Sequence, residues 1–157
     1  MPSISIDAAS RLNMENFSSR QNDQMVRLCA IADPMVDIIY VSPFPLTDDV
    51  KSYYMKLMEL GGITEPESRI RLLSPENMNR FPSHYSLSSM ILYSPNCLRR
   101  IRRGLRGKEA YMVMGMMGPE DKRLAVSLNI PILGSDPNEC SLYASKVCVG
   151  IRPWITR

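Results

Sequence analysis

Residues 37–62, with the sequence DIIYVSPFPLTDDVKSYYMKLMELGG, form the most clearly patterned stretch of the chain. The run 37–41 is short, apolar and β-branched, which is typical of a strand buried on both faces. Thr47 is a favourable N-cap, and the apolar residues after it recur mostly at three- and four-residue spacing. The two glycines at 61 and 62 favour the end of a helix. The stretch therefore predicts a strand followed by a helix.

The same alternation continues on both sides of this unit. Further strands are expected over 70–73, 89–93, 110–114 and 130–133. Helical segments are expected over 24–32, 74–80, 95–103, 119–128 and 138–146. Alternating strands and helices predict an α/β fold, with a Rossmann-like parallel sheet of about five strands in the order 3-2-1-4-5 and helices on both faces. We expect residues 1–23 to form a flexible arm, 24–146 the Rossmann-like domain and 147–157 a divergent tail.

The basic residues of the chain are unevenly distributed. Its 157 residues suit one domain, and its formal net charge is +3. Six positive charges fall between positions 99 and 108, and the remaining 13 basic and 16 acidic residues leave the rest of the chain at −3. This basic patch consists of Arg99, Arg100, Arg102, Arg103, Arg106 and Lys108.

The segment 97–108, CLRRIRRGLRGK, has two interpretations. Leu98, Ile101 and Leu105 recur at three- and four-residue spacing with arginines between them, and such basic amphipathic segments bind calmodulin, acidic membranes or RNA phosphates. The segment lacks the glutamine of an IQ calmodulin motif, and no aromatic residue accompanies the arginines as a stacking platform. The alternative is a surface helix whose apolar stripe packs on the sheet while its arginines face water.

No set of residues with the spacing of a catalytic or metal site is apparent. The single histidine, His84, lies in a Pro/Ser-rich loop, and the carboxylate pairs at 48–49 and 120–121 are explained as helix starts. No signal peptide is expected at the N-terminus, and no apolar run approaches the ~20 residues of a membrane span. The cysteines show no CxxC pair, which favours free thiols in the cytoplasm. They are Cys29, Cys97, Cys140 and Cys148.

The turn after the first strand argues against nucleotide binding in a Rossmann crevice. A dinucleotide site needs a Gly-rich turn whose N–H groups approach the phosphates. Residues 42–49, SPFPLTDD, contain two prolines that lack N–H donors and two aspartates that repel phosphate.

The run 129–146, NIPILGSDPNECSLYASK, resembles the end of the domain that precedes the nucleotide-binding lobes in ATP-grasp proteins. Ile130, Pro131 and Gly134 match the strand and turn of that pattern. Lys146 matches the lysine that in many members reaches the nucleotide phosphates, although Ser145 stands where the family has an acidic residue.

The wider stretch 20–148 is similar to one longer animal protein with an ATP-grasp-like region. The resemblance implies a non-catalytic, pre-ATP-grasp-like structural or interaction module, a truncated or alternative form of the longer protein. ATP is implied as the cofactor of longer members, and the missing ATP-grasp lobes are implied as partners. We expect the chain alone to bind no cofactor or metal. Calmodulin or RNA binding through 97–108 is the alternative.

Overall fold

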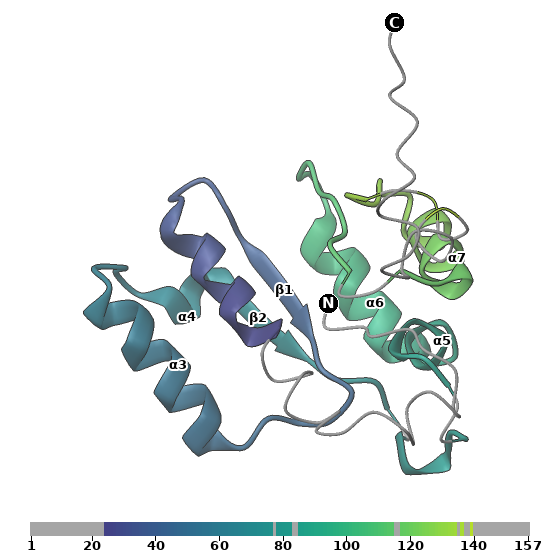
Figure 1. The fold of residues 1–157 in the computed structure, drawn as a ribbon, viewed down its shortest axis with the longest axis horizontal. Coiled ribbons are helices and arrows are strands. Elements are labelled where there is room, and N and C mark those ends of the chain that lie inside the picture. Colours follow the sequence, from purple (N-terminus) through teal and green to yellow (C-terminus); the bar gives the residue numbers. More distant parts are fainter. Residues whose placement is uncertain are drawn as a thin grey trace, which may run out of the picture.

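A computed structural model describes residues 24–76, 78–82, 85–114, 117–134, 136 and 139. Two parallel strands, β1 (Ile38–Val41) and β2 (Ile70–Leu73), lie in its centre, with Ile38 opposite Ile70. Figure 1 shows helices on both sides of this pair. Within the described ranges, β1 and β2 make up the only sheet.

The two strands divide their side chains between two apolar clusters, because successive side chains of a strand point to opposite faces. One cluster includes η1 and α3, and the other includes α5, α6 and α7. The residues facing the first cluster are Ile38, Tyr40, Ile70 and Leu72, and those facing the second are Ile39, Val41 and Leu73.

The first layer begins with η1 (Gln24–Ala32), a 3₁₀-helix. Its fully buried residues Met25, Leu28 and Ile31 recur every three positions. A 3₁₀-helix has three residues per turn, so this spacing places all three side chains on one stripe against the strands. The helix predicted over 24–32 is thus present in 3₁₀ form.

The longest helix of this layer is α3 (Asp48–Leu60). Asp48 and Asp49 lie at its positive end, and it ends where the N–H of Gly61 donates to the carbonyl of Leu57 (3.1 Å). Its buried residues are Met55 and Met58. The short helix α4 (Pro66–Arg69) then leads directly into β2.

Arg69, the last residue of α4, holds the connection between η1 and β1 in place. Its guanidinium donates hydrogen bonds to the carbonyl oxygens of Ile31 (3.0 Å), Asp33 (2.9 Å) and Val36 (3.2 Å). One side chain thereby binds three backbone acceptors, one in the last turn of η1 and two in the connection that follows it.

The second layer contains α5 (Leu87–Leu92), α6 (Pro95–Leu105) and α7 (Pro119–Leu128), and the short 3₁₀-helix η2 (Met78–Arg80) precedes it. The helix α5 packs against both α6 and α7. Figure 1 shows these three helices together on the side of the strands opposite α3.

A buried carboxylate joins α5 to α7. Asp121 is fully buried, and it accepts hydrogen bonds from the Ser88 hydroxyl and from the N–H of Gly118 (2.7 Å). These bonds satisfy a charged group that would otherwise be costly to bury.

The prediction of a five-stranded Rossmann-like sheet is wrong. Residues 89–93, expected as its third strand, lie in α5 and the residue that ends it. Ser86 begins this helix by accepting a hydrogen bond from the N–H of Ser89 (3.2 Å). Buried Leu87, Ser88 and Ile91 lie on one helical face, a pattern that begins before the apolar run SMILY.

The strands expected at 110–114 and 130–133 are reduced to one parallel bridge between Met112 and Ile132. The backbone just before Ile132 cannot continue the hydrogen-bond ladder. The N–H of Ile130 donates to the carbonyl of Ala125 (3.1 Å) in the turn that ends α7, and Pro131 has no N–H to give. The next ladder donor toward residue 110 would be residue 131, so the proline stops the bridge from extending into a strand.

Strands β1 and β2 and helices α3, α6 and α7 confirm the predictions for their segments. The arm predicted over 1–23, the helix predicted over 138–146 and the tail predicted over 147–157 lie outside the described residues, apart from Glu139 in a helix.

Candidate functional site

The helix α6 carries most of the basic patch, and its first turn is fixed by a carboxylate from another segment. Glu76 accepts hydrogen bonds from the N–H groups of Asn96 (2.9 Å) and Cys97 (3.1 Å). Both N–H groups belong to the start of the helix, where no intrahelical acceptor is available and a negative charge is favoured. Pro95 at the first helical position needs no acceptor at all.

The inner face of α6 is fully committed to the core. Cys97, Leu98 and Ile101 are buried, in the cluster that also holds residues of β1, β2, α5 and α7. At Gly104 the helix lies so close to the strands that a Cβ atom would stand 2.7 Å from Cδ1 of Ile39. Gly104 therefore permits the close packing of α6 on β1.

The outer face of α6 and the turn after it present the predicted basic patch. All six of its residues are exposed to solvent. At 100° per residue, Arg99, Arg103 and Arg106 fall on one stripe opposite the buried face, and about 10.5 Å of helix axis separates the first from the last. The structure therefore brings the sequence-predicted residues together on one surface.

Half of the patch is tied to neighbouring residues. Arg102 donates to the carbonyl and hydroxyl oxygens of Ser127 (both 3.1 Å), and Arg99 donates to the side-chain carbonyl of Asn96 (3.1 Å). Lys108 forms an ion pair with Asp37 beside the start of β1. Their hydrogen bond is the main reason that the pKa of Asp37 is lowered.

No carboxylate of the described residues forms an ion pair with Arg99, Arg100, Arg102, Arg103 or Arg106. Chemically, such a surface attracts carboxylates or phosphates, and guanidinium groups can bind either in a bidentate manner. It contains no nucleophile or general base.

Two exposed tyrosines near the patch were missed by the sequence reasoning. Tyr93 is 66% exposed just before α6, and Tyr111 is 61% exposed shortly after Lys108. Tertiary packing decides which tyrosines are exposed. In the sequence, only the short distance of these two tyrosines from the arginines indicated that they belong to the same surface.

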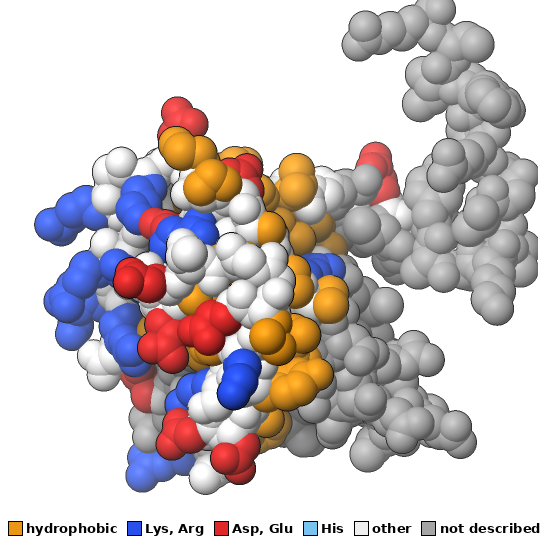
Figure 2. Space-filling view, turned by 90° about the vertical axis from the view of Figure 1, so that its left-hand side faces the viewer, with side chains coloured by type: hydrophobic (Ala, Val, Ile, Leu, Met, Phe, Trp, Pro, Cys, Tyr) orange, Lys and Arg blue, Asp and Glu red, His pale blue; other side chains and the backbone are white. Residues whose placement is uncertain are grey.

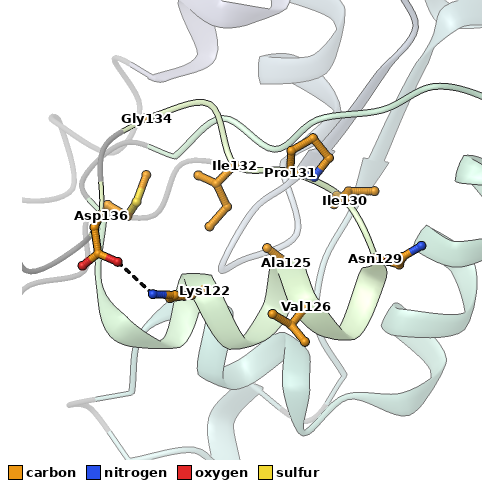
Figure 3. Close-up of a pocket in the computed structure, with 10 residues that line it drawn as sticks. Lys122, Ala125, Val126, Asn129, Ile130, Pro131, Ile132, Gly134 and Asp136 are labelled. Atoms are coloured by element: carbon orange, nitrogen blue, oxygen red, sulfur yellow. Dashed lines mark hydrogen bonds and ion pairs between the residues drawn. The ribbon is translucent and has the colours of Figure 1, made fainter.

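A cavity lies beside α7, next to the described part of the turn predicted near residue 134. Figure 3 shows this cavity of about 560 Å³ between α7 and the segment 130–136. Its lining is largely apolar, including Ala125, Ile130 and Ile132, and Lys122 pairs with Asp136 across one end (2.8 Å). Their hydrogen bond raises the pKa of Lys122. Lys146, the predicted phosphate-binding residue, lies outside the described residues.

The remaining chemical candidates show no reactive arrangement. Burial raises the pKa of the Cys97 thiol to about 11, with a smaller contribution from the nearby Glu76 carboxylate, so Cys97 is a poor nucleophile. Cys29 is exposed, while His84, Cys140 and Cys148 lie outside the described residues. Within the described ranges, no three His, Cys, Asp or Glu residues form a group able to hold a metal, and no helix has the length and apolarity to cross a bilayer.

The described residues thus form a mainly helical fold around one two-stranded parallel sheet, with a strongly basic helical surface. The chain is 39% identical, over 93% of its length, to IQ motif-containing protein H of Danio rerio. The resemblance to a longer animal protein is therefore confirmed, and this chain spans about 15% of the length of that relative. No family model and no solved structure matches the chain. The ATP-grasp-like part of the resemblance stays a prediction.

Proposed function

We propose that this chain is a non-enzymatic interaction module, similar to a segment of IQ motif-containing protein H, that binds an acidic protein surface through α6. The observation that carries the proposal is the stripe of Arg99, Arg103 and Arg106, exposed on a fixed helix without a carboxylate partner among the described residues. Clustered charges of one sign steer a complementary partner and set its orientation.

The packing of α6 favours a rigid binding surface. The carboxylate of Glu76 holds its N-terminal turn, and Arg102 and Lys108 are tied to α7 and to the start of β1. A partner would therefore meet arginines on a preformed backbone, which lowers the entropy cost of binding.

Calmodulin is the first acidic partner to test, because the relative is named for an IQ motif and such motifs bind calmodulin. Calmodulin usually encloses the apolar face of its target helix. Cys97, Leu98 and Ile101 form that face here and are buried in the core. We therefore expect calmodulin to dock on the arginines of folded α6 rather than to enclose the helix.

The test is a titration of the 157-residue chain with calmodulin, with and without calcium, followed by calorimetry. Replacing Arg103 and Arg106 by Glu should weaken binding by about tenfold or more, because both charges reverse on the central stripe. The matched control replaces Arg80 and Arg123 by Glu, which changes the net charge equally on exposed residues outside the patch. Equal losses in both variants, or no binding at all, would contradict calmodulin docking at this surface.

RNA is the second candidate, favoured by the exposed rings of Tyr93 and Tyr111 near the two ends of the basic segment. Arginines would contact phosphates, and the rings would stack on bases. Binding to a single-stranded RNA should weaken steeply with salt, and the Arg103→Glu/Arg106→Glu variant should reduce the slope of log K against log salt by about 1.4. A slope unchanged by the variant would dismiss RNA at α6.

We expect ATP binding in the longer protein that this chain resembles, and not in this chain alone. Lys146 remains the candidate contact to ATP phosphates, with missing ATP-grasp lobes as partners, and a cytoplasmic location is expected. This chain alone should give no heat with ATP and magnesium in a calorimeter. Micromolar ATP binding that is lost in Lys146→Ala would contradict the non-catalytic assignment.

A further inference from the structure

The helix α3 has an apolar stripe that the fold leaves in solvent. Val50, Tyr53, Leu57 and Leu60 are 37%, 63%, 44% and 80% exposed, although Met55 and Met58 of the same helix are buried. Their spacing of three, four and three residues places them on one side of the helix. We call these four residues the α3 stripe.

The α3 stripe is unusual for a surface helix. A typical amphipathic helix buries its apolar arc and exposes its polar one, and a helix with apolar residues over most of its circumference is normally covered. Figure 2, which views the molecule from the side of α3, shows hydrophobic side chains gathered in a band next to the charged ones. A contiguous exposed apolar surface marks an interaction site.

The charges beside the stripe limit what can cover it. Asp49 and Lys56 lie along one edge of the stripe, seven residues apart, and both are exposed. Neither takes part in an ion pair with a described residue, whereas the neighbouring Asp48 is paired with Lys51 (2.9 Å). The edge therefore carries one free negative charge near the start of the helix and one free positive charge about 10.5 Å further along.

We propose that the α3 stripe binds the α3 stripe of a second copy of this chain. In an antiparallel pair of helices related by a two-fold axis, like edges meet on the same side, and Asp49 of each copy comes opposite Lys56 of the other. Two ion pairs then form by symmetry, as an isologous interface requires. Tyr53 then lies near the two-fold axis against its counterpart, and Val50 lies against Leu57 of the other copy. In a parallel pair the same edges would not meet.

The experiment is sedimentation equilibrium of the full chain between about 10 µM and 1 mM. One pair of helices lies at the small end of specific interfaces, so we expect a monomer–dimer equilibrium with a dissociation constant of about 10⁻⁵ to 10⁻⁴ M. Leu57→Glu should raise this constant by about tenfold or more, because it places a charge in the apolar contact. Thermal melts of each variant check that the monomer still folds.

A charge exchange then identifies the partner and the orientation. Asp49→Lys and Lys56→Asp should each weaken the dimer about fivefold, since each creates like-charge contacts, and the double variant should restore it. A monomer throughout the concentration range overturns the proposal. A dimer that Leu57→Glu leaves intact, or that the double variant does not rescue, overturns it as well. The basic patch on α6 is unaltered in all these variants, so the outcome is independent of calmodulin or RNA binding.

Discussion

The helices α6 and α3 have similar amphipathic sequences but use their apolar residues differently. In α6, Cys97, Leu98 and Ile101 enter the core, and most of the exposed residues are arginines. In α3, Met55 and Met58 enter the core while the α3 stripe stays in solvent. The difference teaches that apolar spacing identifies a helix, and that tertiary contacts decide which part of an apolar arc becomes core.

The largest expected effect compares one residue of each apolar arc. Ile101→Ala on α6 removes a buried side chain from the larger cluster and should lower the free energy of unfolding by about 2–4 kcal/mol. Leu57→Ala on α3 should cost less than about 0.5 kcal/mol in the monomer, because its side chain is exposed. Urea unfolding at low protein concentration measures both. Equal losses of unfolding free energy would mean that Ile101 and Leu57 are buried to the same extent.

A smaller effect concerns how each helix begins. The first turn of α6 is satisfied by the Glu76 carboxylate, while Thr47 at the start of α3 makes no side-chain cap hydrogen bond. Glu76→Ala should therefore destabilise the protein by about 1–2 kcal/mol, and Thr47→Ala by less than about 0.5 kcal/mol. Thermal melts of the two variants test this order. A larger loss for Thr47→Ala would contradict it.

The smallest effect is a pH dependence at the far end of α6. Asp37 has a lowered pKa in the folded protein because of Lys108, so their pair adds stability above the pKa of the unfolded carboxyl, about 3.9, and loses it as the pH falls through the folded value. Lys108→Gln should reduce stability at pH 7, and the difference from the wild type should shrink below about pH 4. A difference that persists at pH 3 would assign the effect to packing instead.

The sequence predicted the elements whose local and tertiary preferences agree. Strand β1, with its β-branched run, and helix α7, with Pro119 at its first position and acidic residues after it, occur as expected. Residues 89–93 were misassigned because SMILY has strand propensity, while the serine hydroxyls at 86 and 88 stabilise a helix through bonds that propensity does not describe. Pro131 lacks the N–H that would extend the bridge between Met112 and Ile132 into a fifth strand.

The basic patch was predictable because its residues are close in sequence and helical spacing is regular. The cap from Glu76 and the contact of Gly104 with Ile39 join segments far apart in the chain, so no local pattern indicated them. The α3 stripe was visible in the sequence as apolar spacing, but its exposure was not.

Arg69 has a consequence for the order in which the protein assembles. The three carbonyl oxygens that it binds belong to residues 33 to 38 positions earlier in the chain. Without Arg69, the bend between η1 and β1 keeps only its own backbone bond from the N–H of Val36 to the carbonyl of Asp33 (3.1 Å). The bend therefore gains its side-chain support only when α4, the segment that leads into β2, has formed.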